Sequence, residues 1–554
     1  MKKYLLITTL LLITSSLNAQ WTSNVALNTL VRDSSGIGEV TPLSATTLNG
    51  STYISWFEPA SGVNYKLKMQ RLGADGVKQW QSDGITVSAY PQNTALFRYD
   101  LTTDLEGNAI VAFQDERSGQ LDIAVYKVDT AGNLVWGAAG VTLTDSLSTQ
   151  GLAPTIGITA SNNIIIAWNP NATSKWIAFQ KLTPSGSPMW SGIKRITSTT
   201  VKYSRPTMVA AGSDDFTTLY AEETGSGFPP TSKLYSQRFD QNGNTVWASP
   251  VIVSSKTIPF FYFPKAMSDE NEGYYVAFNA SLNSNPSVGD VYVQHVNGNG
   301  ALWSTTGTPA SALTNYQKFT AGIAVEPGGS HAIITMKFTD LNQSQSGVYQ
   351  QRIDSAGNLL MGSNASQVIA VSAAYHDPYG SAVTPTGIIT GYVTGNPPNQ
   401  TISAAKTDYN GVVQWNGNSV TICSTVSAKD DGAVGLFRNN QVVFVWQDER
   451  SGGGIYAQNI SDGGVAGPQT STIKELTSGN FILSGNPSTD LNIINLSNSQ
   501  NIHIRICDIE GKLIQEYEWK SGDEIRLQPK CISGIYFVTL TNISITKTLT
   551  WVKE

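Results

Sequence analysis

The sequence has little cysteine, little histidine and few charges. Its 554 residues include three cysteines and four histidines, and 14% of the residues are charged. Three cysteines in so long a chain cannot form a disulfide framework, so packing must hold the core together. The histidines lack the paired spacing of a metal site, and they are His295, His331, His376 and His503. We therefore predict no metal centre and no cofactor.

Basic clusters and common catalytic motifs are also absent. The net charge is -6, and no stripe of lysine and arginine is present that could release counterions from a phosphate backbone. The sequence contains no G-x-S-x-G, H-E-x-x-H or phosphate-loop motif. Its D-x-x-G-N turns lack the alternating carboxylates of a calcium loop. These absences argue against nucleic acid as a partner and against the enzyme classes that these motifs mark.

Long apolar runs are missing except at the N-terminus. The first twenty residues, MKKYLLITTLLLITSSLNAQ, contain two lysines, an apolar stretch from Tyr4 to Ile13 and the small residue Ala19. The apolar stretch is shorter than the roughly 20 residues that a membrane span needs. The pattern therefore predicts a secretory signal peptide over residues 1–19 and a mature chain without a transmembrane segment.

What the sequence does contain is an internal repeat. The hexapeptide QDERSG occurs at 114–119 and again at 447–452. A turn followed by a tryptophan, as in DTAGNLVW, recurs at intervals of 54 to 58 residues, and Trp21 stands 59 residues before its first copy. The two hexapeptides are 333 residues apart, so they occupy the same place in units six repeats apart. The large residue that ends each copy is Trp80, Trp136, Trp190, Trp247, Trp303, Met361 or Trp415.

Each unit divides into four short apolar segments. In the third unit these are residues 154–160, 163–169, 176–182 and 191–197. An Asp-x-x-Gly sequence suits a type I turn, which makes the turn before each tryptophan a hairpin connection whose tryptophan begins the fourth strand. Four antiparallel strands, repeated about eight times without a helical pattern, predict an all-β fold. We expect an eight-bladed β-propeller over residues 20–470, with seven blades as the alternative.

The two ends of the repeat region are complementary. Residues 21–31, WTSNVALNTLV, are similar to the fourth strand of a unit, whereas the eighth unit supplies only its first three strands. We expect the N-terminal strand to complete the last blade, because this closure removes exposed sheet edges. The tryptophans are expected to supply much of the packing between blades.

A different β module follows the repeats. The period stops near Thr470, and a linker over residues 471–480 leads to a C-terminal domain over residues 481–554. Alternating polar and apolar residues in its segments predict a small Ig-like antiparallel sandwich. Whether Cys507 and Cys531 form a disulfide within this domain stays open.

Three short motifs stand in order in this module: Asn-Pro at 486–487, Asp-Ile-Glu-Gly-Lys at 508–512 and Gly-Ile-Tyr-Phe-Val at 534–538. They resemble the type A C-terminal sorting domain of the type IX secretion system. The resemblance implies a translocation signal read by the outer-membrane export machinery of Bacteroidetes-type bacteria, and a protein that is released or displayed on the outer-membrane surface. For the hairpin residues, simple turn chemistry is the alternative to recognition by the translocon. The matching residues are Asn486, Pro487, Asp508, Gly511, Lys512, Gly534, Tyr536 and Lys547. The body of the chain resembles secreted bacterial β-propeller repeat proteins.

The QDERSG loop is the strongest candidate for a binding site. It joins the second and third strands of its unit, and alignment of the units places Glu58, Asp115, Glu222 and Asp448 at one position. Three of them belong to consecutive blades and would form an acidic arc that binds a cation or sugar hydroxyls, or acts as acid and base. The alternative is that each aspartate pairs with the nearby arginine and braces the loop. The candidate binding residues are Glu58, Asp115, Glu116, Arg117, Asp448, Glu449 and Arg450.

Aromatic residues suggest a second kind of site. The segment TIPFFYFP contains Phe260, Phe261 and Tyr262, which could form a platform for carbohydrate or could belong to the propeller core. We predict a secreted, surface-targeted propeller that binds polysaccharide or protein, and we assign no catalytic residue. The alternatives are a glycan-active hydrolase or lyase and a structural cell-surface scaffold.

Overall fold

The computed structural model describes residues 21–468 and 481–553, except for 33–37, 39, 62–63, 93–97, 149, 172, 174, 211–212, 226–229, 260–261, 283, 485–487, 496–500, 510, 521–523 and 542–545. The chain divides into two compact units, Met1–Pro468 and Gln469–Glu554. The predicted signal peptide and the predicted linker lie outside the described residues. Within the described part, the fold is all-β apart from one short 3-10 turn, η1 (Arg450–Gly452).

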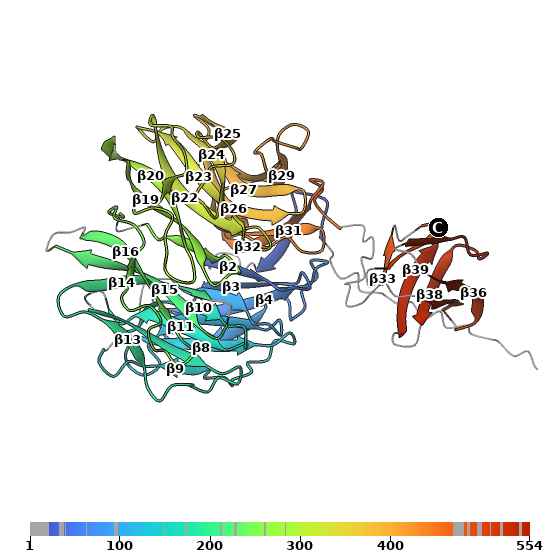
Figure 1. The fold of residues 1–554 in the computed structure, drawn as a ribbon, viewed down its shortest axis with the longest axis horizontal. Helices are drawn as coiled ribbons and strands as arrows, with labels where there is room; N and C mark the ends of the chain where they lie inside the picture. The colour runs from blue at the N-terminus through green and yellow to red at the C-terminus, as the bar shows by residue number, and fades with distance from the viewer. Residues whose placement is uncertain are drawn as a thin grey trace, which may run out of the picture. The chain divides into compact units, whose positions relative to one another are not determined.

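The first unit consists of four-stranded antiparallel sheets that follow one another along the chain (Figure 1). The described residues form eight such sheets in this unit, one for each predicted repeat. The first sheet comprises β2 (Val40–Thr46), β3 (Thr52–Pro59), β4 (Tyr65–Leu72) and β5 (Ile85–Ser88), and the second comprises β6 (Asp100–Thr103), β7 (Ala109–Asp115), β8 (Asp122–Val128) and β9 (Val141–Leu143). The third sheet comprises β10 (Leu152–Ile158), β11 (Ile164–Asn169), β12 (Trp176–Leu182) and β13 (Lys194–Thr197). The fourth comprises β14 (Lys202–Ala210), β15 (Phe216–Thr224), β16 (Thr231–Phe239) and β17 (Val251–Ile252).

The second half repeats this arrangement with longer strands. The remaining sheets are β18 (Lys265–Ser268), β19 (Tyr274–Leu282), β20 (Asn285–Val296) and β21 (Thr308–Pro309); β22 (Tyr316–Val325), β23 (His331–Asp340), β24 (Ser346–Asp354) and β25 (Ser366–Ser372); β26 (His376–Thr384), β27 (Gly387–Thr394), β28 (Gln400–Thr407) and β29 (Val420–Ser427); and β30 (Lys429–Val434), β31 (Gln441–Asp448), β32 (Gly454–Ser461) and β1 (Thr29–Arg32).

The middle strands of the sheets are covered on both faces. Every residue of β7, AIVAFQD, and of β8, DIAVYKV, is buried. Strand β31, QVVFVWQD, is buried along its whole length as well. Because a strand buried on both faces needs no polar side, these segments read as nearly continuous apolar runs. The core of the unit therefore lies between neighbouring sheets.

The N-terminal strand completes the last sheet, as the sequence predicted. Strand β1 pairs antiparallel with β32, with Thr29 opposite Ala457 and Leu30 opposite Tyr456. Figure 1 shows these blue and orange parts of the chain side by side. The first strand of each sheet contacts the first strand of the next, in the order β2, β6, β10, β14, β18, β22, β26 and β30, and β30 contacts β2.

Each repeat tryptophan packs against the turn glycine of the following sheet. The Trp21 indole N–H donates to the carbonyl of Ala74 at 2.8 Å, and a Cβ on Gly76 would come within 2.4 Å of the Trp21 ring. The same contact joins every successive pair of sheets: Trp80–Gly132, Trp136–Gly186, Trp190–Gly243, Trp247–Gly300, Trp303–Gly357, Met361–Gly411 and Trp415–Gly464. The residues that recur in each sequence repeat thus form an interlock, in which each sheet packs against the turn of the following sheet.

The position of these tryptophans corrects one expectation. We expected each tryptophan to begin the fourth strand of its unit, but Trp80 precedes β5, which begins at Ile85. The third strand instead ends in a bridge between Leu72 and Lys78, and the indole turns away to reach the next sheet. Packing between sheets outweighs ladder pairing at this position.

The second unit contains two sheets around one core. One sheet comprises β33 (Phe481–Ser484), β34 (Leu491–Asn495) and β37 (Glu524–Leu527); the other comprises β36 (Leu513–Trp519), β35 (Ile502–Asp508), β38 (Gly534–Thr541) and β39 (Thr546–Lys553). Leu491 of the first sheet and Ile504 and Trp551 of the second belong to the same buried cluster. Cys507 and Cys531 are free thiols. None of the described segments is a helix long and apolar enough to cross a membrane.

Candidate functional site

The second copy of QDERSG is a buried ionic network. The Asp448 side chain is completely buried and accepts from Arg450 Nη2 at 2.5 Å, Trp446 Nε1 at 2.8 Å and Ser427 Oγ at 2.6 Å. Lys429 Nζ, also fully buried, lies 3.0 Å from Asp448 Oδ2. Burial alone would raise the pKa of Asp448, but the hydrogen bonds from Arg450, Ser427 and Trp446 outweigh it and hold this pKa well below its usual range.

The first copy repeats the aspartate–arginine pair of this network. Asp115 is fully buried and accepts from Arg117 Nε at 2.8 Å and from Arg117 Nη2 at 2.5 Å. The Arg117 guanidinium lies over the Tyr90 ring at 4.4 Å. Both loops therefore contain the aspartate–arginine brace that the sequence left open as the alternative to a binding site.

The predicted acidic arc is closed to solvent at its three carboxylates. The Glu58 side chain is 10% exposed and pairs with Arg32 at 3.0 Å. Asp115 and Asp448 have no exposed side-chain surface. Glu449 is exposed but accepts from Gln447 Nε2 at 3.1 Å, and Glu116 is half-buried. Ligand binding by this group of residues stays a prediction, and the geometry favours the bracing role.

An open cleft lies between the β22–β25 sheet and the β26–β29 sheet. It has a volume of about 430 Å³. Its walls come from β22, from β23, from the loop between β23 and β24, from the connection between β25 and β26 with the start of β26, and from the loop between β27 and β28. Tyr262, in the connection between β17 and β18, adds a further wall. The lining residues are Tyr262, Phe319, Lys337, Thr339, Gln343, Ser344, Gln345, Ser346, Ala373, Tyr375, Asp377 and Asn396.

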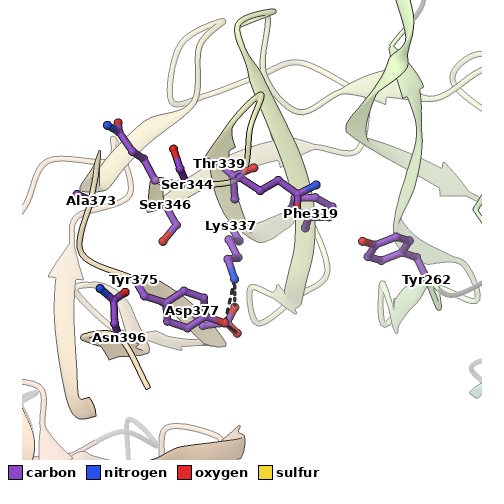
Figure 2. A pocket seen from close by; sticks show the side chains of 12 residues that line it. Tyr262, Phe319, Lys337, Thr339, Ser344, Ser346, Ala373, Tyr375, Asp377 and Asn396 are labelled. Carbon is purple, nitrogen blue, oxygen red and sulfur yellow. Dashed lines mark hydrogen bonds and ion pairs between the residues drawn. The ribbon is translucent and has the colours of Figure 1, made fainter. Parts of the chain in front are cut away.

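Aromatic rings flank this cleft, and one of them is open to solvent. Tyr262 is 40% exposed, and its ring stacks on Phe319 with centroids 5.6 Å apart. Figure 2 shows these two residues across the cleft from Tyr375 and Asn396. The sequence had marked Tyr262 as part of an aromatic platform; Phe260 and Phe261 lie outside the described residues.

Opposite Tyr262, three polar side chains form one network. Tyr375 Oη donates to Asp377 Oδ2 at 2.7 Å and accepts from Lys337 Nζ at 3.1 Å. Lys337 Nζ also lies 3.3 Å from Asp377 Oδ1, the contact dashed in Figure 2. Burial, followed by the charge of Asp377, raises the pKa of Tyr375. The phenol therefore keeps its proton at neutral pH and acts as a hydrogen-bond donor.

Sequence reasoning missed most of this cleft. Lys337, Tyr375, Asp377 and Asn396 stand on different strands and loops and share no motif. They lie close together only because the β22–β25 sheet packs against the β26–β29 sheet. The one signal in the sequence was the run of aromatics that ends at Tyr262 and Phe263.

The sorting motif of the second unit forms a tight turn. The Gly511 N–H donates to the Asp508 carbonyl at 3.0 Å, and the Lys512 N–H donates to Asp508 Oδ1 at 2.9 Å. Gly511 has φ of +84°, a conformation that other residues rarely adopt. This geometry accounts for the Asp-x-x-Gly-Lys spacing by turn chemistry, and recognition of these side chains by the translocon stays a prediction.

The other sorting residues lie along the closing strands. Gly534 begins β38, and the buried Tyr536 donates from Oη to the Ile532 carbonyl at 2.9 Å. Lys547 belongs to β39, and Asn486 and Pro487 lie outside the described residues.

The comparison with known families identifies the second unit. Residues 485–554 match the family described as the secretion system C-terminal sorting domain. This segment is a type IX sorting domain, so the protein interacts with the type IX secretion machinery and is exported to the cell surface or the medium.

Solved structures of low sequence identity also match this chain. No curated protein matches the sequence significantly. A family 25 ulvan lyase bound to a GlcA-Rha3S oligosaccharide is 12% identical, with 79% of this chain and 97% of that chain covered and a TM-score of 0.41. The Hadza microbial sialidase Hz136 is 12% identical, with coverage of 78% and 94% and a TM-score of 0.32. A protein of unknown function from Dyadobacter fermentans is 9% identical, with coverage of 78% and 96% and a TM-score of 0.37.

Proposed function

We propose that the first unit is a closed eight-bladed β-propeller over residues 20–470, joined by the linker 471–480 to its sorting domain, and that it binds carbohydrate at the cell surface. Two observations support the closed ring. The first strands contact one another in a cycle that returns from β30 to β2, and β1 completes the last sheet. The contacts between a turn glycine and the repeat tryptophan, or Met361 in one unit, follow the same cycle through all eight sheets.

The cleft beside Tyr262 carries the carbohydrate proposal. An exposed aromatic ring offers a flat apolar surface to the C–H face of a sugar ring. Amide and hydroxyl groups of Gln343, Ser344 and Asn396 can pair with sugar hydroxyls. The cleft volume of about 430 Å³ lies within the roughly 300–1,000 Å³ typical of small-ligand sites.

A hydrolase on this scaffold has less support. Most glycoside hydrolases use two carboxyl groups about 5–9.5 Å apart, and Asp377 is the one carboxylate among the described lining residues. Its partner Tyr375 has a raised pKa, which makes it a poor base at neutral pH. A purely structural scaffold would leave the exposed face of Tyr262 without a role. We therefore favour a non-catalytic binding protein.

A glycan array with the mature protein tests this proposal. We expect retention of a set of oligosaccharides, and Tyr262→Ala is expected to weaken binding about tenfold through loss of the stacking surface. Tyr90→Ala is the matched control, since Tyr90 is also 40% exposed but lies outside the cleft. Its binding should equal that of the wild type.

Two results would count against the proposal. Equal retention by Tyr262→Ala and the wild type would remove the cleft as the site. Release of sugar products during incubation would instead establish the hydrolase or lyase alternative.

A further inference from the structure

A second cavity lies where the first strands of several sheets meet. It has a volume of about 580 Å³ and is lined by residues of β14, β18, β22, β26 and β30. Register shifts in β22 and β26 leave Ala321 and Tyr379 as extra residues, and both line this inner cavity. A β-bulge re-aims a side chain in this way, so the repeated irregularity shapes the cavity wall.

Two cations line this cavity without an ion pair among the described residues, although the charge of Asp100 acts on Arg98. Arg98 and Lys265 both line it. Within the described residues, neither forms an ion pair with a carboxylate. Asp100, two residues from Arg98, instead accepts from the Ile156 N–H at 2.8 Å and from Thr155 Oγ1 at 3.2 Å. Lys265 is exposed at the start of β18, and desolvation together with the Arg98 charge lowers its pKa.

Three buried polar atoms around the same cavity lack partners. Among the described residues, Arg98 Nη1, Thr207 Oγ1 and Tyr379 Oη are buried without a hydrogen bond. They come from three different sheets or their connections, and all three residues line the cavity. A buried donor without a partner destabilises the fold. Such groups converging on one cavity indicate a bound polar ligand.

The remaining wall is apolar. Phe263 and Met267 line the cavity and are 40% and 37% exposed. The Arg98 guanidinium lies over the Phe263 ring at 3.7 Å, which fixes its plane. Arg98 Nη1 has no hydrogen-bond partner, so this guanidinium can donate to an oxygen of a carboxylate or sulfate group.

We propose that the inner cavity is an oxyanion-binding site in which Arg98 and Lys265 hold a carboxylate or sulfate group. The group is either a free inorganic anion or the acidic substituent of a sugar. The apolar wall of Phe263 and Met267 would contact the carbon skeleton in the second case. This site is separate from the Tyr262 cleft, and its existence does not depend on carbohydrate binding there.

Calorimetric titration of the mature protein at constant ionic strength tests the proposal. The probes are sodium sulfate, sodium glucuronate and, as a neutral control, glucose. We expect saturable binding of at least one anion and none of glucose. Arg98→Met and Lys265→Met are each expected to weaken that binding at least about tenfold. Lys233→Met, which removes an exposed lysine of the same unit, should leave it unchanged.

The pattern of results identifies the source of the anion. Binding of sulfate and glucuronate alike supports a general oxyanion site, and preference for glucuronate supports an acidic sugar. Absence of binding of either anion to the wild type would overturn the proposal without any variant. Unchanged binding in both Arg98→Met and Lys265→Met would overturn it as well. Should Arg98→Met fail to fold, unchanged binding in Lys265→Met alone would overturn the proposal, and Arg98→Lys, which retains the charge, is expected to bind more weakly than the wild type because it loses the guanidinium.

Discussion

Asp448→Ala is expected to lower the free energy of unfolding of the first unit by about 3–5 kcal/mol, because it leaves a buried lysine without its counter-charge. Lys429 and Asp448 both have fully buried side chains. Removal of the carboxylate also strips Trp446 and Ser427 of their acceptor. Chemical denaturation of wild type and variant, followed by tryptophan fluorescence, measures the difference.

Asp83→Ala is the control for this variant. Asp83 pairs with Arg32 at 2.8 Å, but its side chain is 60% exposed. A surface pair of this kind contributes about 0–1 kcal/mol. Equal losses in the two variants would show that the QDERSG network does not stabilise the fold.

The same network sets a pH dependence. The pKa of Asp448 is depressed in the folded protein, so its contribution to stability is present above the unfolded pKa, about 3.9. That contribution is lost as the pH falls below this value. Between pH 7 and pH 3, the wild type should therefore lose more stability than Asp448→Ala.

Gly76→Ala is expected to destabilise the first unit by about 2–5 kcal/mol, combining the strain of a left-handed backbone with a collision between sheets. Gly76 has φ of +83°, and its added Cβ would lie 2.4 Å from the Trp21 ring. Trp21 is 2% exposed, so Trp21→Ala should cost about 3–5 kcal/mol by itself. Thermal and denaturant unfolding of both variants provide the measurement.

Gly137→Ala separates the collision from the backbone strain. Gly137 has the same φ of +83°, but its added Cβ meets no atom within 4 Å. It should cost only about 1–2 kcal/mol. A double-mutant cycle of Gly76→Ala with Trp21→Ala should be non-additive, since the two residues are in contact. Additive effects, or equal costs for the two glycines, would contradict the interlock between the first and last sheets.

The sequence was sufficient to predict the repeated four-stranded units because the residues that recur in every unit contact one another between neighbouring sheets. A tryptophan and a turn glycine recur together since each indole packs on the next turn, as Trp21 does on Gly76. The sequence alone did not show which turn glycine each tryptophan packs against. This is why Trp80 was placed at the start of a strand rather than across a sheet boundary.

The candidate sites were less predictable, for a different physical reason. The QDERSG loop repeats because an Asp-x-Arg pair braces it locally, and both members lie within three residues. The cleft residues Lys337, Asp377 and Asn396 come from separate segments that only tertiary packing joins. Whether Arg98 Nη1 finds a hydrogen-bond partner depends on the tertiary contacts of Arg98, and the sequence alone does not show these contacts.

A crystal structure of the mature protein with the oligosaccharide that the glycan array retains best tests the carbohydrate-binding account most directly. We expect a sugar ring to stack on Tyr262 and its hydroxyls to pair with Asn396 and the β23–β24 loop. A sugar bound at the QDERSG loops, with the Tyr262 cleft empty, would contradict it.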